Sequence, residues 1–161
     1  MDVEVQLKVQ DLLARYVQAI DDNRLEAWPD FFVDRCRYLV TTAENLEQGL
    51  PLGLIYATSR AMLRDRVRSL REANVYEAQR YRHVIGPPVI EPQDSVGMGG
   101  SVRAQTNFIV VRIMHTGETM IFASGRYDDR IVLGGPEGPR FAEKVVVIDS
   151  RQVDTLLAIP L

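Results

Sequence analysis

The sequence predicts an α+β fold in which a curved, cone-like antiparallel sheet packs against helices from the N-terminal half of the chain. The first observation is a stripe of apolar residues at helical spacing between residues 3 and 21. The second is a long hairpin in residues 112–130, which turns at Thr116-Gly117-Glu118. Ordinary strands run for about five or six residues, so strands this long need helices to cover one face.

The helices are predicted from periodicity and from residues that favour helix ends. The first ends at Asp21-Asp22-Asn23, and Asn23 is expected to cap a short second helix that runs from Arg24 to about Phe32 across Pro29. A third helix is expected after Thr58 or Ser59. The apolar residues of the first helix are Val5, Val9, Leu12, Leu13, Tyr16, Val17 and Ile20.

The strands are predicted from β-branched and aromatic runs that Gly- and Pro-rich segments separate. The candidate strands are residues 37–41, 79–84, 89–90, 102–115, 119–133 and 140–149. Residues 44–53 are expected to form a loop. On the strand from Val102, one face carries Val102, Ala104, Thr106, Phe108 and Val110. The other face is polar early, at Arg103, Gln105 and Asn107, and apolar late, at Ile109 and Val111. The apolar half is therefore expected to be covered on both sides, by the chain's own helices or by a partner.

Length and composition indicate one globular domain spanning residues 1–161. The net charge of −3 disfavours nucleic-acid binding, which generally needs a basic face. The single cysteine, Cys36, is expected to be a small buried residue at the head of a strand, and a reducing cytoplasm is the natural compartment. The chain has no signal-peptide pattern and no apolar run near the roughly 20 residues of a membrane span.

The residues that could carry chemistry are few. Two histidines, His83 and His115, are not spaced as metal ligands, and one cysteine cannot supply the two that a Rieske cluster needs. One constellation remains, in which Asp21, Tyr38 and His83 line an internal pocket for proton transfer in a dehydratase or isomerase. The alternative is that Asp21 caps or pairs, Tyr38 packs and His83 is a satisfied core histidine.

The third predicted helix carries many arginines, and their role is open from the sequence. An arginine-rich helix face is most often solvated, but arginine is also favoured at protein interfaces. The charged residues of this helix are Arg60, Arg64, Asp65, Arg66, Arg68, Arg71 and Glu72.

Several short sequence segments occur in an order that resembles the small (beta) subunits of the aromatic-ring-hydroxylating dioxygenases. They include Ala27-Trp-Pro-Asp-Phe-Phe32, Arg80-Tyr-Arg-His-Val-Ile-Gly86, Thr106-Asn-Phe-Ile-Val-Val-Arg112, Phe122-Ala-Ser-Gly-Arg-Tyr-Asp-Asp129 and Val145-Val-Val-Ile-Asp149. Within the family, residues 71–76, 112–118 and 154–161 are most similar to the terephthalate dioxygenase small subunit. Many members have a tryptophan where this chain has Phe141.

The resemblance implies a fold of the nuclear-transport-factor-2-like, or cystatin-like, kind. It also implies a large alpha subunit that holds a Rieske [2Fe-2S] cluster and a mononuclear non-haem iron, usually with three large and three small subunits in the complex. An NAD(P)H-dependent reductase would act on the large subunit. The small subunit of this family is structural, so no catalytic, cofactor-binding or metal-binding residues are expected in this chain. His115 and Asp128-Asp129 are then expected to be turn and strand-end surface.

Overall fold

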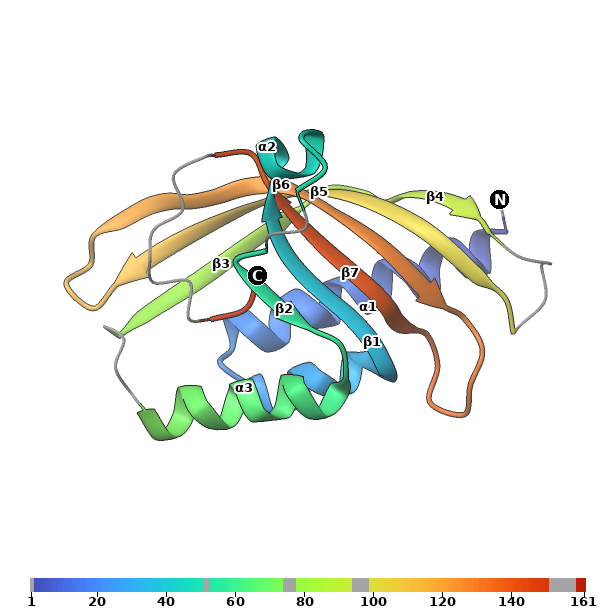
Figure 1. Ribbon diagram of the computed structural model, residues 1–161, viewed down its shortest axis with the longest axis horizontal. Coiled ribbons are helices and arrows are strands. Elements are labelled where there is room, and N and C mark those ends of the chain that lie inside the picture. Colours follow the sequence, from blue (N-terminus) through green and yellow to red (C-terminus); the bar gives the residue numbers. More distant parts are fainter. Residues whose placement is uncertain (1, 51–52, 74–77, 94–98, 151–158) are drawn as a thin grey trace.

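The computed structural model describes residues 2–50, 53–73, 78–93, 99–150 and 159–161. Within these ranges a seven-stranded, strongly curved sheet carries helices on its concave side (Figure 1). The elements are α1 (Val3–Asp21), the 3-10 helix η1 (Leu25–Phe31), β1 (Phe32–Thr42), α2 (Ala43–Glu47), β2 (Ile55–Ala57), α3 (Arg60–Ala73), β3 (Gln79–Ile85), β4 (Val89–Pro92), β5 (Ser101–Met114), β6 (Thr119–Val132) and β7 (Arg140–Ile148).

The strand order is β2-β1-β7-β6-β5-β3, and β4 pairs with β5 beyond the end of β3. Every pair is antiparallel except β1 and β7, which run parallel, so the sheet is mixed where the sequence predicted an antiparallel one. Hairpins set the direction of β5, β6 and β7. No short connection joins β1 to β7, so local turn signals could not reveal how this pair runs.

The predicted hairpin is confirmed. β5 and β6 are each 14 residues long, and Gly117 in the turn has a φ of 89°, a left-handed conformation that glycine adopts without steric cost. A register shift between Val110 and Val111 marks a bulge, which adds to the bend of the long strands.

The helix ends follow the predictions only in part. Ser59 caps α3 as expected, because its Oγ accepts a hydrogen bond from the amide of Met62 at 3.2 Å. Asn23 does not cap the second helix; its φ is 58°, and its side chain accepts a bond from Arg71 instead. The expected loop contains α2, whose first turn Thr42 caps by accepting from the amide of Asn45 at 3.2 Å.

The core lies between the concave face of the sheet and helices α1, η1 and α3. Trp28, Phe32 and Tyr38 form mutual edge-to-face contacts, with ring centroids 5.2–5.9 Å apart. Cys36 is buried, as predicted. A smaller apolar cluster on the opposite face of the sheet is made by Leu39, Val145 and Val147 with Ala43 of α2.

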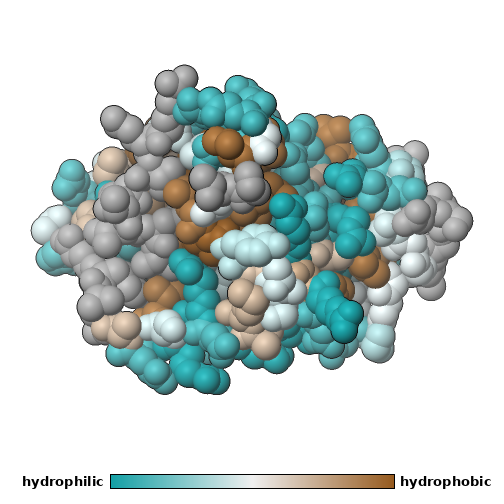
Figure 2. Space-filling model, in the orientation of Figure 1, coloured by the Kyte–Doolittle hydropathy of each residue, from teal (hydrophilic) through white to brown (hydrophobic). Residues whose placement is uncertain are grey.

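Apolar residues gather in the middle of the face shown in Figure 2, below α2, and hydrophilic residues follow α3. No helix in the described ranges has the length and apolar character to cross a membrane.

Candidate functional site

The structure joins two of the three residues expected in a proton-transfer site. Asp21 is the last residue of α1, and His83 lies in the middle of β3, the edge strand beside it. The Asp21 carboxylate is 2.6 Å from His83 Nδ1 through Oδ1, and it accepts the His83 backbone amide at 2.8 Å through Oδ2. Both side chains are buried. One carboxylate therefore fixes the imidazole and also pairs an amide of the edge strand.

Tyr38, the third residue, is engaged elsewhere. Its hydroxyl donates to the backbone oxygen of Leu161 at 3.2 Å and accepts from the amide of Leu161 at the same distance. Tyr16 donates to the same Leu161 oxygen at 2.7 Å, and Trp28 Nε1 donates to the Tyr16 hydroxyl. Burial raises the pKa of Tyr38 to about 12, so its hydroxyl stays protonated at neutral pH. Tyr38 therefore anchors Leu161 within the core.

Proton transfer by His83 would need a substrate within hydrogen-bond reach of its second nitrogen. His83 Nε2 is buried and has no hydrogen-bond partner among the described residues, and the same holds for Thr106 Oγ1 and the Tyr127 hydroxyl. The three pockets whose linings are described lie elsewhere on the surface. The Asp21–His83 pair is therefore a buried contact between α1 and β3 with one free nitrogen, without a described opening toward a substrate.

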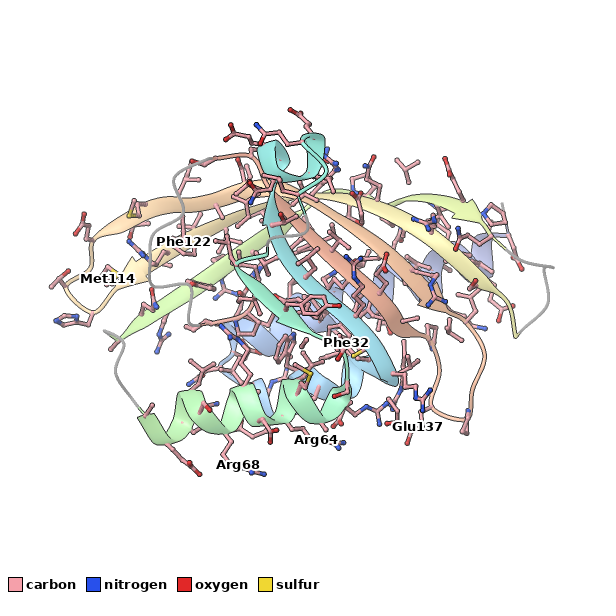
Figure 3. The ribbon with its side chains drawn as sticks, in the orientation of Figure 1. Phe32, Arg64, Arg68, Met114, Phe122 and Glu137 are labelled. Carbon is pink, nitrogen blue, oxygen red and sulfur yellow. The ribbon has the colours of Figure 1, made fainter. Side chains whose placement is uncertain are left out.

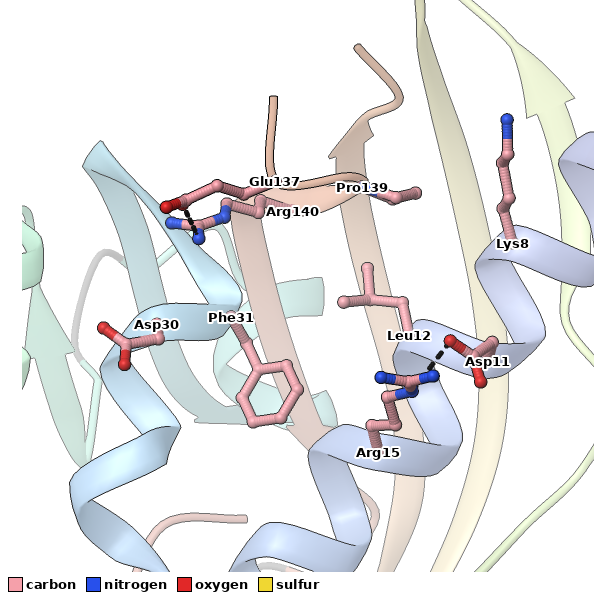
Figure 4. Close-up of a pocket in the computed structure, with 9 residues that line it drawn as sticks. All are labelled: Lys8, Asp11, Leu12, Arg15, Asp30, Phe31, Glu137, Pro139 and Arg140. Carbon is pink, nitrogen blue, oxygen red and sulfur yellow. Dashed lines mark hydrogen bonds and ion pairs between the residues drawn. The ribbon is translucent and has the colours of Figure 1, made fainter. Parts of the chain in front are cut away.

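The pocket shown in Figure 4 lies between α1, η1 and the start of β7, and it is too small for a typical ligand. Its volume is about 190 Å³, whereas small-molecule sites commonly measure roughly 300–1,000 Å³. Its charges are already paired, since Arg15 binds Asp11 at 2.9 Å and Arg140 binds Glu137. A second pocket, between β1 and the segment before β7, measures about 220 Å³.

A buried ion pair that was not predicted from the sequence is the most unusual polar feature of the core. Lys144 of β7 contacts both carboxylate oxygens of Asp129 on β6 at 3.1 and 3.2 Å, and both side chains are fully buried. The expectation that Asp129 is strand-end surface is wrong. Residues of β6 alternate between the two faces, and Asp129 shares the inward face with Tyr127 and Ile131, so that pattern was the available signal.

Three aromatic rings surround the Lys144 ammonium. It lies 3.7 Å from the ring centroid of Tyr127, 4.3 Å from that of Phe141 and 4.4 Å from that of Tyr16. Attraction to the ring faces supplements the single carboxylate in holding this cation in an apolar core. Phe141 is thus one of the three rings that hold the Lys144 ammonium.

The buried pair predicts a pH dependence of stability. Burial raises the pKa of Asp129 from 3.8 to about 6, although Lys144 opposes the shift. Between these two values the folded chain binds more protons than the unfolded chain, so this group makes stability fall as pH rises from about 4 to about 6. Urea unfolding of the wild type and of an Asp129→Leu/Lys144→Met double variant at pH 4.5 and 7 checks this. We expect the free energy of unfolding of the wild type, minus that of the double variant, to be smaller at pH 7 than at pH 4.5.

The arginines of α3 are bound within the chain, which favours the solvated-face interpretation over a docking surface. Arg71 forms bonds with Glu26 at 2.7 Å and with Asn23 at 2.9 Å, and Arg60 binds Asp34 and the backbone oxygen of Phe32. The side chains of Arg64 and Arg68 point away from the sheet (Figure 3).

In the described part of the chain, no three His, Cys, Asp or Glu side chains come together as a metal ion would require. His115, next to the hairpin turn, is exposed.

A SnoaL-like domain model matches residues 1–143. The chain is 43% identical to subunit beta 2 of the terminal oxygenase component of terephthalate 1,2-dioxygenase from Comamonas sp, over 97% of this chain and 98% of that protein. It is 37% identical to the anthranilate 1,2-dioxygenase small subunit of Burkholderia cepacia, over 99% of this chain and 96% of that protein.

A solved structure from Novosphingobium aromaticivorans, assigned as the beta subunit of an aromatic-ring-hydroxylating dioxygenase, superposes with a TM-score of 0.86. It is 38% identical, and the match covers 98% of this chain and 97% of that one. The predicted fold is thus confirmed, and so is the family resemblance. With its SnoaL-like fold and this similarity along nearly its whole length, the chain belongs to the small (beta) subunits of the aromatic-ring-hydroxylating dioxygenases.

Proposed function

We propose that this chain is the structural, non-catalytic small subunit of an oxygenase that dihydroxylates an aromatic carboxylic acid similar to terephthalate. The observation that carries the proposal is the 43% identity to a terephthalate dioxygenase beta subunit over 97% of the chain. Residues 1–161 act as one domain in this assembly. The cytoplasm suits the free, buried thiol of Cys36.

The chemistry of the proposed complex belongs to its large alpha subunit, with which the chain forms a hexamer of three large and three small subunits. A Rieske cluster and a mononuclear iron in the large subunit would receive electrons from an NAD(P)H-dependent reductase and activate dioxygen. No residue of this chain binds metal or cofactor in the proposal. The polar groups of its core support this, because they already bind partners within the chain. Asp21 accepts the backbone amide of His83, Tyr38 binds the backbone of Leu161, and Lys144 binds Asp129.

Reconstitution with the large subunit tests the proposed function. The purified small subunit alone should contain no stoichiometric iron and should oxidise no substrate. Co-expression with the large subunit should yield a complex that contains iron and, with reductase and NAD(P)H, converts terephthalate to its cis-dihydrodiol. Stoichiometric iron in the isolated chain, or turnover without the large subunit, would overturn the proposal.

Substitution of the buried histidine pair separates a structural role from catalysis. We expect Asp21→Ala to lower the free energy of unfolding by about 1–3 kcal/mol, because it leaves the buried imidazole and amide of His83 without their acceptor. Turnover per iron in the assembled complex should stay unchanged. The matched control is Asp22→Ala, which removes an exposed carboxylate from the next position and should have little effect. A loss of turnover with the complex intact would favour a proton-transfer role for the pair.

A further inference from the structure

The outer face of the sheet carries an apolar stripe close to the long hairpin. The stripe consists of Val84, Ile109, Val111, Ile113 and Ile121, from strands β3, β5 and β6. Three of its members are strongly exposed, Val84 by 59%, Ile109 by 42% and Ile121 by 67%. Register places them side by side, because Val84 pairs with Ile109, and Val111 pairs with Ile121. They form a continuous surface rather than scattered exposed residues, and such surfaces mark interaction sites.

The opposite face of the same strands is covered by this chain. Tyr81, Phe108 and Val110, which alternate with the stripe residues, are buried against the core that α1 and α3 cover. The apolar half of β5 was expected to be covered on both sides. Among the described residues, the chain supplies that cover only on the inner side, and the stripe is left open for another molecule.

The charges beside the stripe indicate which kind of partner surface would fit it. Arg80 and Arg82 of β3 are exposed and lie beside it, since Arg82 pairs with Val111 and Arg80 with Ile113. Neither arginine forms an ion pair with a described carboxylate. Farther along the same face of the sheet, Gln105 and Arg126 both bind Asp128 within the chain. The complementary partner has an apolar surface edged by carboxylates.

The size of the stripe argues against a second copy of this chain as the sole occupant. Its five side chains expose a few hundred Å² of apolar surface at most, whereas a stable interface buries roughly 800 Å² on each partner. A larger partner could cover the stripe and continue over β3 and the hairpin. A shallow hollow of about 420 Å³ adjoins the stripe there, lined by Ala78, Arg80, Ile113, Met114 and His115 among others.

We propose that the apolar stripe, with Arg80 and Arg82 at its edge, is where the large subunit of the oxygenase docks. The proposal rests on the proposed function, which supplies that partner, and it names the contact surface. Apolar contact would provide most of the affinity. The two arginines would pair with carboxylates of the large subunit and fix its position along β3.

A charge placed on the stripe tests the docking surface. The experiment co-expresses the large subunit with wild-type chain, with Ile121→Asp, or with Asn107→Asp as a matched control on the polar half of the same face. Because Ile121 is 67% exposed, Ile121→Asp should fold with an unchanged melting temperature when purified alone. It should bind the large subunit at least about tenfold more weakly, a loss of 1.4 kcal/mol or more. Asn107→Asp should bind like the wild type.

Each other outcome has a definite meaning. If the wild type and Ile121→Asp form equally stable complexes, the docking proposal is wrong and the proposed function stands. If the wild type forms no complex with the large subunit, the proposed function fails and the docking site with it. If Ile121→Asp changes only the oligomeric state of the isolated chain, a second copy occupies the stripe, which also overturns the proposal.

The arginines allow a second, independent measurement. Arg82→Glu should weaken the complex, and most strongly at low salt, because it replaces an attractive charge pair at the edge of the interface with a repulsive one that salt screens. Arg103→Glu is the control, an exposed arginine on the polar half of the same face. Equal effects of the two substitutions would indicate general electrostatic attraction and would contradict a specific role for the arginine edge.

Discussion

Replacing Lys144 with methionine is expected to lower the free energy of unfolding by about 3–5 kcal/mol, the cost of leaving one member of a buried ion pair without its partner. The Asp129 carboxylate would remain fully buried without its cation, and its folded-state pKa would rise further. The rings of Tyr16, Tyr127 and Phe141 would keep apolar contact with the methionine, so the loss is electrostatic rather than a cavity. Urea unfolding at pH 7 measures the change.

Two further variants identify the cause of that loss. Asp129→Leu combined with Lys144→Met removes both charges, and we expect it to recover most of the stability, because a well-packed apolar pair often equals a buried ion pair. Arg126→Met is the control on the neighbouring strand β6; it breaks a partly exposed pair with Asp128 and should cost less than about 1 kcal/mol. If the double variant is no more stable than Lys144→Met alone, poor packing explains the loss, and the ion-pair argument is wrong.

Much of the fold could be predicted because it depends on local sequence. The helical stripe ends at Asp21 in the structure as in the prediction, since Asp22 and Asn23 interrupt the pattern there. The hairpin turn at Gly117 follows from a residue that tolerates positive φ. The parallel pairing of β1 with β7 could not be predicted in this way, because it brings together segments about a hundred residues apart without a turn between them.

The candidate site was harder to predict, because its contacts connect distant parts of the chain. Asp21 and His83 can be predicted as candidates because their side chains can transfer protons, and the structure shows that they are in contact. Tyr38 was grouped with them on the same grounds, although Leu161 holds it. The resemblance predicts Asp129 as strand-end surface, whereas the contact with Lys144 on the neighbouring strand makes its burial possible. Of the C-terminal segment 154–161 that carries part of the family resemblance, residues 154–158 lie outside the described residues.

Gly125 lies in the middle of β6, in the segment Phe122-Ala-Ser-Gly-Arg-Tyr-Asp-Asp129, and the structure gives a steric reason why this position is a glycine. Ile148 of β7 pairs with Gly125, and a Cβ atom at this glycine would lie 1.9 Å from the backbone oxygen of Val147. That atom belongs to the backbone of a neighbouring strand, so no side-chain rotation can relieve the clash. We expect Gly125→Ala to cost about 3 kcal/mol, the upper part of the range for overpacked cores, because β6 and β7 must move apart.

The matched control is Gly86→Ala at the end of β3, where the added Cβ would lie 3.8 Å from its nearest neighbour, an ordinary van der Waals contact. It should change the free energy of unfolding by less than about 1 kcal/mol, as substitutions away from tight contacts usually do. Urea unfolding of the two variants beside the wild type measures the difference. Equal stability of Gly125→Ala and Gly86→Ala would contradict the close approach of β6 and β7. A large loss at Gly125 alone would show that this glycine is needed for strand pairing in the sheet whose outer face carries the proposed docking stripe.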